Sequence, residues 1–215
     1  STPCGTLFPY TTLFRSLVVF LSDHGEEFHE HGGREHGRLF IEQLHVPLVI
    51  RFPRAAGVAP RRVAPTVRLL DVAPTILDAA GLPIPAAMQG RSLLPAARGE
   101  PPRDAPPVLS YAGADFARVR LELDGWSYSN EPTRRADRGL FHLASDPREL
   151  ADRAGEEPER LERLAAAARE LVARDRAVRR RLLEDAAKRG RRPEIDARLL
   201  ERLRALGYLD GDAPR

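Results

Sequence analysis

The sequence predicts an α/β fold that is followed by a small antiparallel sheet and C-terminal helices. Two continuous apolar runs, LVVFL at 17–21 and VPLVIRF at 46–52, are typical of strands buried on both faces, as in a parallel sheet. A helix pattern at 71–80 follows these strands, and this alternation favours the α/β class. Beyond residue 107 the pattern changes to short alternating segments and then to helical periodicity.

The α/β part ends in a helix with clear start and stop signals. In the segment 71–80, Asp71 is the expected N-cap, Pro74 lies in the first turn and Gly81 is the expected stop. A short strand is expected at 67–70, directly before this helix.

The C-terminal part combines a small sheet with helices. Segment 83–107, rich in Pro, Gly and Arg, is predicted to be a linker. Three segments after it predict an antiparallel sheet with a turn at Asp124-Gly125, namely 108–112, 117–131 and 139–144. Apolar residues at helical spacing then predict helices over 156–188 and 194–206.

The composition excludes several classes of protein. A single cysteine, Cys4, excludes an internal disulfide framework and a cysteine-rich zinc module. No apolar run reaches the roughly 18–20 residues of a membrane span. The net charge of +3 gives no global basic footprint for nucleic acid.

One stretch, Arg169–Arg192, is locally basic, with ten basic and four acidic residues. A non-catalytic module with a basic interaction helix is therefore an alternative function. Acidic residues intersperse the stretch and aromatic residues are absent from it, so a solvated helix face is the favoured interpretation. Salt-dependent binding of nucleic acid to a peptide of this helix discriminates between the two.

The residues Ser22-Asp23-His24-Gly25-Glu26 come directly after the first predicted strand. Ligands of α/β sheets bind beyond the carboxyl ends of strands. A carboxylate beside an imidazole forms half of a site for a divalent metal, so Asp23 and His24 are candidate ligands. Gly25 permits the turn and a close backbone approach. The competing interpretation is a capping and hydrogen-bonding pair.

Histidines are concentrated around this motif. Five of the six lie between His24 and His45, a density that packing alone does not explain. Several glutamates neighbour His29 and His31, so surface ion pairing is the preferred interpretation of these two. His45 precedes a predicted strand and is expected to be structural.

Several blocks together resemble a known family. LVVFLSDHGEEFHEHGGREHG, EQLHVPLVIRFP, LLDVAPTILDAAGLPIP and GRSLLP follow one another as in the C-terminal half of the catalytic domain of sulfatases, in the alkaline-phosphatase superfamily. LFHLASDPREL resembles the closing strand and DP-x-E turn of the same family, and EIDARLLERLRALGYLD resembles a tail of some bacterial members. The resemblance covers roughly Leu17 to the end. It implies part of an alkaline-phosphatase-like sheet sandwiched by helices.

The resemblance also assigns roles to residues. It implies that Asp23 and His24 are ligands of one divalent metal, with calcium as the usual sulfatase ion and manganese or zinc compatible with a histidine ligand. His36 takes the position of a basic residue that contacts the transferred group, where it would stabilise the leaving oxygen or act as general acid. His29 departs from the pattern, because the family typically has Gly there.

The implied activity is sulfuric ester hydrolysis, with a small-molecule or glycan sulfate ester as substrate. Histidines at 24 and 36 are commoner in phosphonate and phosphodiester hydrolases and in phosphoethanolamine- or glycerophosphate-type transferases, which are therefore the alternatives. The family's formylglycine nucleophile arises in a C/S-x-P-x-R motif far upstream, and this sequence does not contain that motif. We therefore expect the chain alone to be catalytically incompetent. A periplasmic, secreted or membrane-tethered location, the last through an upstream segment, is expected by resemblance only.

The N-terminal segment 1–16, STPCGTLFPYTTLFRS, resembles translated sequencing-adapter read-through and is predicted to be artefactual. The remaining chain is predicted to comprise the C-terminal part of a sulfatase-like catalytic domain at 17–100, a small antiparallel-sheet subdomain at 101–148 and a helical tail at 149–215.

Overall fold

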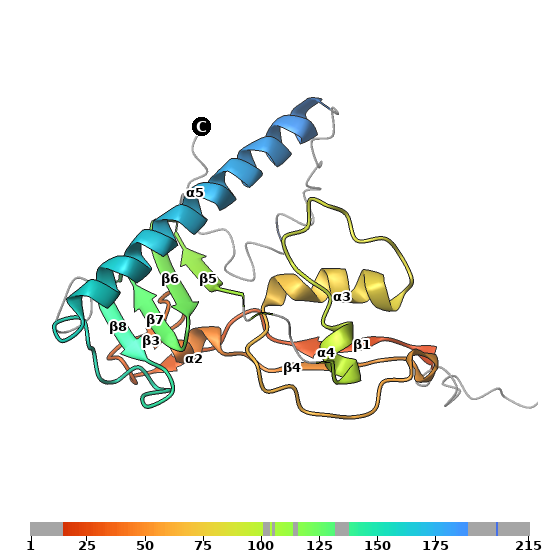
Figure 1. Ribbon diagram of the computed structural model, residues 1–215, viewed down its shortest axis with the longest axis horizontal. Helices are drawn as coiled ribbons and strands as arrows, with labels where there is room; N and C mark the ends of the chain where they lie inside the picture. Colours follow the sequence, from red (N-terminus) through yellow and green to blue (C-terminus); the bar gives the residue numbers. More distant parts are fainter. Residues whose placement is uncertain are drawn as a thin grey trace, which may run out of the picture. The chain divides into compact units, whose positions relative to one another are not determined.

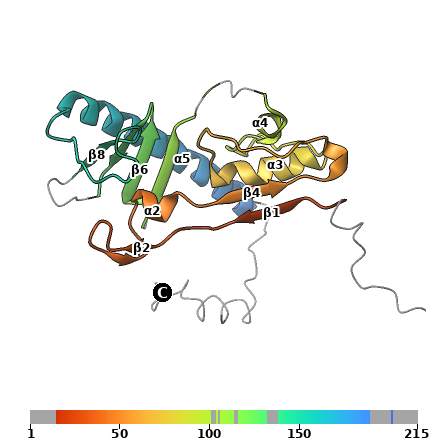
Figure 2. The same cartoon turned by 90° about the horizontal axis from the view of Figure 1, so that it is seen from below.

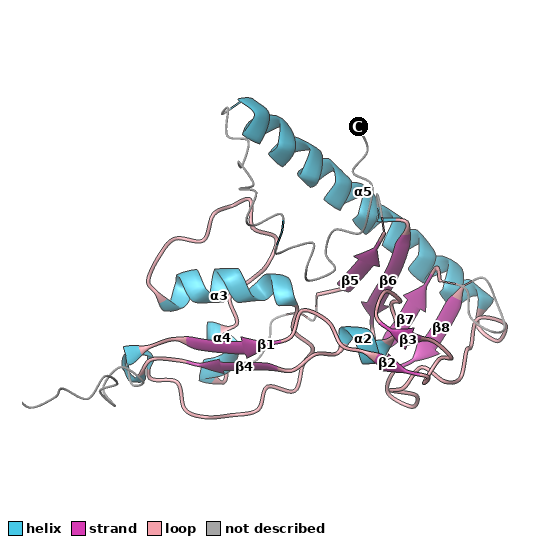
Figure 3. Ribbon diagram, turned by 180° about the vertical axis from the view of Figure 1, so that it is seen from behind, coloured by secondary structure: helices cyan, strands magenta, loops and turns pink. Residues whose placement is uncertain are grey.

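The computed structural model describes residues 15–100, 104, 106–113, 116–131, 138–188 and 201. The predicted helix at 194–206, apart from residue 201, and the segment 1–14 lie outside the described residues. The chain divides into two compact units, 1–169 and 170–215. The strands of the described part belong to the first unit and form three groups, β1–β4, β2–β3 and β5–β6–β7–β8 (Figures 1 and 3).

The first group is an antiparallel pair of strands, β1 (Val18–Leu21) and β4 (Leu48–Arg51). The helices α3 (Val72–Ala79) and α4 (Leu94–Arg98) lie on the same side of this pair (Figure 2). Because partners directly opposite one another share a face, the other face carries Val18, Phe20 and Val49, and all three are exposed. One face of the pair is therefore covered and the other is not.

Both strands lie where the apolar runs predict them, but their pairing and burial differ from the prediction. The expectation of parallel strands buried on both faces is wrong in this structure, since the pair is antiparallel and Phe20 is 63% exposed. An unbroken apolar run carries no information about strand direction, which depends here on the path of residues 22–47. These residues run out through β2 (Glu27–Phe28), β3 (Arg34–Glu35) and α2 (Ile41–Leu44) and return beside β1.

The helix predicted at 71–80 is confirmed as α3, with Asp71 at the N-cap position, Pro74 in the first turn and Gly81 in the left-handed region after its end. The strand predicted at 67–70 is wrong, because a 3₁₀ turn occupies Leu69–Asp71. The Asp71 carboxylate explains the difference. It accepts a hydrogen bond from the backbone N–H of Arg68 (3.0 Å), three residues earlier, which closes the turn. It also accepts the backbone N–H of Arg91 (2.9 Å).

The predicted small sheet is confirmed as four antiparallel strands in chain order. They are β5 (Val108–Ala112), β6 (Arg118–Leu123), β7 (Trp126–Ser129) and β8 (Gly139–His142). Asp124 and Gly125 both have positive φ angles, 52° and 77°, as a two-residue type I′ hairpin turn requires.

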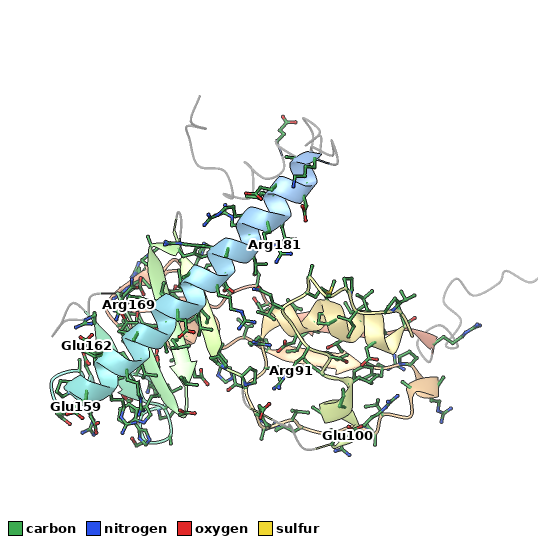
Figure 4. The ribbon with its side chains drawn as sticks, turned by 45° about the horizontal axis from the view of Figure 1, so that its top comes forward. Arg91, Glu100, Glu159, Glu162, Arg169 and Arg181 are labelled. Atoms are coloured by element: carbon green, nitrogen blue, oxygen red, sulfur yellow. The ribbon has the colours of Figure 1, made fainter. Side chains whose placement is uncertain are left out.

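The main core lies on one face of this sheet. Leu121, Tyr128 and Leu140 are directly opposite one another on neighbouring strands and are buried. The long helix α5 (Pro158–Lys188) confirms the predicted helix, and its apolar residues Leu161, Leu164, Ala165 and Ala168 are buried within the first unit. Its charged residues alternate with them, as the labelled side chains of Glu159, Glu162 and Arg169 show (Figure 4). No helix in the described part of the chain is both long and apolar enough to cross a membrane.

The opposite face of the sheet contains a buried ion pair. The guanidinium of Arg120 on β6 donates hydrogen bonds from Nε (3.2 Å) and Nη2 (2.8 Å) to Oε1 of Glu149. Both side chains are almost completely buried. The second carboxylate oxygen of Glu149 accepts the backbone N–H of Ile41 at 2.9 Å, so this pair also holds α2 against the sheet.

The turn that supplies Glu149 is the DP-x-E sequence at 146–149. The Asp146 carboxylate accepts the backbone N–H groups of Leu150 (3.0 Å) and Ala151 (2.8 Å), which closes the turn. Glu149 itself has a φ of 55°. Its carboxylate accepts the hydrogen bonds from Arg120 on this face of the sheet. Through Glu149, the turn after β8 is therefore hydrogen-bonded to the start of α2.

Candidate metal centre

The candidate ligands Asp23 and His24 lie in the loop that begins where β1 ends. The Ser22 hydroxyl donates to the backbone oxygen of His24 (2.6 Å), and the backbone N–H of His24 donates to Oδ1 of Asp23 (3.1 Å). The two side chains stay partly accessible, with exposed fractions of 63% for Asp23 and 38% for His24. Local hydrogen bonds thus fix the loop while both side chains face solvent in part.

Gly25 fixes how the loop leaves the strand. Its backbone N–H donates to the carbonyl oxygen of Gln43 at 2.8 Å. A Cβ atom at this position would lie 2.1 Å from the carbonyl oxygen of Glu42, which belongs to the backbone and cannot be displaced cheaply. The close backbone approach that the sequence predicts at Gly25 is therefore confirmed, and no residue with a side chain fits there.

The structure brings His36 to this loop. The imidazole rings of His24 and His36 stack with their centroids 4.2 Å apart and an angle of 30° between their planes. The Nδ1 atom of His36 lies 3.0 Å from Oε1 of Glu26. Ligand atoms of His24, Glu26 and His36 all lie within 4.8 Å of one another, so these three residues form a group able to hold a metal ion.

The neighbouring Glu27 anchors the same loop from inside. Its carboxylate is almost completely buried and accepts the backbone N–H groups of His31 (3.1 Å) and Gly33 (2.6 Å). The side-chain amide of Gln43 donates to it at 3.2 Å, and the Arg38 guanidinium lies 3.7 Å away. The two adjacent glutamates therefore have different contacts. Glu27 binds the backbone of the loop, and Glu26 pairs with His36.

His31 does not fit the surface ion pairing that was preferred for it. Its ring is nearly buried and stacks on Phe40 with centroids 3.8 Å apart and planes 4° apart. Nδ1 lies 2.8 Å from the Glu42 carboxylate, and Nε2 lies 2.9 Å from the backbone oxygen of Glu149. His31 therefore joins the loop to the turn beside the four-stranded sheet, a role that depends on residues more than 100 positions away.

His29 lies at a strained backbone position. Its φ angle is 75°, in the left-handed region that favours glycine. This is the position where the resemblance has Gly, and the structure supplies the reason for that preference. The exposed ring accepts a hydrogen bond from Nε of Arg34 at 2.7 Å.

One acid in this loop has a shifted pKa. The backbone N–H groups of Glu30 itself and of Phe28 lower the pKa of the exposed Glu30 carboxyl by stabilising its charged form. The Glu30 carboxylate therefore binds the backbone of the loop rather than the His24–His36 pair.

The donor set of the loop fits part of a metal shell. Asp23 supplies carboxylate oxygen and His24 supplies imidazole nitrogen, the mixture that divalent transition metals such as manganese and zinc accept readily. Calcium takes oxygen ligands almost exclusively, so an imidazole ligand makes manganese or zinc compatible with the site beside calcium. As ligands, Asp23 and His24 would supply two donors, and a complete shell needs more.

Sequence reasoning missed one residue of this group, Glu26. The signal that was available is its position in the DHGE sequence, three residues after Asp23. Its pairing with His36, ten residues away, follows from the hairpin of β2 and β3, which turns the chain back.

The chain is similar in sequence to known sulfatases. Residues 29–113 match the family model described as N-sulphoglucosamine sulphohydrolase, C-terminal. Arylsulfatase K of Xenopus laevis is 31% identical over 173 residues, which cover 74% of this chain and 32% of that protein. The chain belongs to the sulfatase family. It corresponds to the C-terminal portion of a sulfatase, as the resemblance implies.

The chain is also similar to two further proteins. Human Arylsulfatase K is 31% identical over 159 residues, 68% of this chain and 29% of that protein. A phosphonate monoester hydrolase of Agrobacterium radiobacter has a structure with a TM-score of 0.55 and 27% identity, covering 74% of this chain and 35% of that chain. The sulfatase-like chain spans about a third of the length of the relatives it matches.

The fold is confirmed by solved sulfatases. The structure of a 2-O GAG sulfatase matches with a TM-score of 0.63 and 23% identity, covering 76% of this chain and 37% of that chain. This likeness confirms the predicted α/β, alkaline-phosphatase-like class with its small antiparallel sheet and C-terminal helix.

Proposed function

We propose that this chain is the C-terminal part of a metal-dependent sulfatase and supplies three residues of its active site. Asp23 and His24 are two of the metal ligands, and His36 acts on the leaving group. The observation that carries the proposal is the stacking of His24 on His36 beyond the end of β1, in a chain of this family. Residues 12 positions apart thus meet beyond the carboxyl end of β1.

His36 is suited to the departure of the leaving oxygen. Its ring is 56% exposed and carries Glu26 at Nδ1, so Nε2 is the atom available to a substrate. A protonated imidazole at that point donates a proton to the leaving oxygen or stabilises its charge. His36 of this chain would itself carry out this proton transfer or charge stabilisation.

A divalent metal held in part by Asp23 and His24 would neutralise charge that develops on the transferred group. We propose manganese or zinc beside calcium, because His24 adds a nitrogen donor to the set. The formylglycine nucleophile and the remaining ligands are proposed to lie in a longer polypeptide, so the chain alone is expected to lack activity.

The proposed substrate is a sulfate ester of a small molecule or glycan. The relatives at 31% identity carry the name arylsulfatase, and the matching family model is that of an N-sulphoglucosamine sulphohydrolase. A location in the periplasm, outside the cell or at a membrane is proposed from family membership alone.

The test begins with the reading frame upstream of the Leu17 codon. The locus is resequenced, and the longest continuous polypeptide is expressed and assayed with an aryl sulfate. We expect sulfate release, with a loss of about 10²–10⁴-fold in kcat when His36→Ala removes the general acid. Asp23→Asn is expected to lower metal content as well, whereas the exposed His45→Ala serves as the control. A frame that starts at Ser1, or an active enzyme indifferent to His36→Ala, contradicts the proposal.

A second candidate function is phosphonate or phosphodiester hydrolysis. Two observations favour it, the histidines at 24 and 36 and the 27% and 26% identity to phosphonate monoester hydrolases of Agrobacterium radiobacter and Silicibacter pomeroyi. Assaying the same enzyme with an aryl phosphonate monoester separates the two. A higher kcat/KM for the phosphonate than for the sulfate supports this second function.

A further inference from the structure

Glu26 lies at the candidate site without a role in the function proposed above. Its Oε1 atom is 3.0 Å from Nδ1 of His36, and both side chains are about half exposed. A carboxylate only accepts hydrogen bonds, so Nδ1 of His36 must carry the proton of this bond. In the neutral ring the proton is then on Nδ1 and the lone pair is on Nε2.

The face of the His36 ring is also held. His24 stacks against it at 4.2 Å, while Glu26 holds one edge. Among the described residues, no hydrogen-bond partner of the remaining ring atom, Nε2, is found. The two contacts together therefore define where Nε2 points.

The loop explains why Glu26 is available for this contact. Glu27 begins β2, and its buried carboxylate is held by the backbone N–H groups of His31 and Gly33. Successive residues of an extended chain point to opposite sides. Anchoring Glu27 inward therefore directs Glu26 outward, to the side where His36 lies.

We propose that Glu26 is a positioning residue for His36, which fixes the ring's orientation and its Nδ1–H tautomer so that Nε2 faces the reacting group. This inference rests on the proposed function of His36 for its purpose. The contact itself is a property of the chain and is measured without substrate. A carboxylate that holds an imidazole in one tautomer is a known way to prepare an acid–base group.

The test reads the tautomer of His36 by two-bond ¹H–¹⁵N correlation on the ¹⁵N-labelled full chain, with a chelator present. The spectra are recorded at about pH 8, where an ordinary histidine ring is neutral. We expect the Nδ1–H pattern in the wild type and its loss in Glu26→Ala, where the ring returns to the Nε2–H form that free histidine prefers. Glu26→Gln keeps a carbonyl acceptor and is expected to retain the Nδ1–H pattern.

Two controls keep the result interpretable. Glu30→Ala changes another exposed glutamate of the same loop and is expected to leave the His36 pattern unchanged. The amide spectrum and the His31 ring signals report whether each variant keeps the loop folded. A wild-type His36 in the Nε2–H form, or a pattern unchanged in a folded Glu26→Ala, overturns the proposal.

A metal titration separates positioning from ligation. Zn²⁺ alone is added to the wild type, Glu26→Ala and His24→Ala. We expect His24→Ala to weaken binding more than Glu26→Ala does. Equal losses would make Glu26 a ligand and overturn its positioning role. An active longer enzyme that keeps the Nδ1–H pattern but is indifferent to His36→Ala would instead count against the proposed function of His36.

Discussion

The strand pair β1–β4 and the four-stranded sheet β5–β8 are stabilised in different ways. The sheet buries an apolar row on one face, and a charged pair of Arg120 and Glu149 on the other. The strand pair carries the candidate site but leaves Phe20 and Val49 exposed on its open face. The sheet therefore has both faces covered within the chain, and the pair has only one.

This difference shows that the site-bearing region is the incomplete one. An exposed apolar face suits a strand pair that a further layer of structure covers, which agrees with a chain that spans about a third of its relatives. The loop at 22–47 connects the two regions, and His31 and Ile41 attach it to Glu149. The position of the site therefore depends on the better-packed region.

The largest effect is expected from breaking the buried ion pair. Glu149→Ala removes the buried carboxylate that accepts two hydrogen bonds from Arg120 and leaves this buried charge only the longer contact of 3.6 Å with Glu122, and removal of one member of a buried pair costs about 3–5 kcal/mol. Urea unfolding followed by circular dichroism measures the free energy. The matched control is Glu162→Ala, which breaks the exposed Arg138–Glu162 pair and is expected to cost far less, because solvent screens an exposed pair. Equal losses would show that burial does not distinguish the two pairs.

The next largest effect compares an apolar residue from each region. Leu121 is fully buried in the sheet, so Leu121→Ala is expected to cost about 2–5 kcal/mol. Phe20 on β1 is 63% exposed, and Phe20→Ala is expected to cost less than about 1 kcal/mol despite removing a larger side chain. Both are measured by the same urea unfolding. A larger loss for Phe20→Ala would mean that the open face of the strand pair is covered in solution.

The loop between the regions offers a smaller effect of opposite sign. His29→Gly relieves a non-glycine residue at a φ of 75° and is expected to raise the free energy of unfolding by about 1 kcal/mol. The loss of the Arg34 contact offsets little because the ring is exposed. His45→Gly is the control, since its φ of −84° suits any residue and glycine there only adds freedom to the unfolded chain. A destabilising His29→Gly would show that the ring contributes more than its backbone costs.

The sequence predicts the elements of both regions better than the way they pack. Apolar runs locate the two strands, and Asp124-Gly125 locates the hairpin, because these depend on neighbouring residues. The His24 ring is brought against His36, and the Asp23 carboxylate lies 3.9 Å from Nε2 of His24, whereas the roles of these residues stay predictions. The domain boundaries at 16, 100 and 148 also stay predictions.

Several features depend on contacts distant in sequence and were not predictable from local patterns. The DP-x-E pattern locates the turn that contains Glu149, but it does not indicate that Glu149 pairs with the buried Arg120, 29 positions away. The sequence around His31 predicts a surface histidine. In the structure its Nε2 lies 2.9 Å from the backbone oxygen of Glu149, which is 118 positions away. The direction of β1 relative to β4 likewise depends on the path of the intervening loop.

The smallest effect concerns the buried row of the sheet and appears only in alkali. Burial raises the pKa of the Tyr128 phenol, and the nearby Arg138 and Arg169 oppose this shift without cancelling it. Because the folded state then holds the phenolic proton more tightly than the unfolded chain, stability is retained below the ordinary value of about 10 and falls as the pH rises through the folded pKa. Tyr128→Phe is expected to lose less stability than the wild type between about pH 9 and about pH 11. Tyr111→Phe, at an exposed position in β5, is expected to keep the wild-type slope. If Tyr128→Phe and the wild type lose stability equally, the phenol is hydrated in solution and the apolar row is open at its centre, which would remove the contrast with β1–β4.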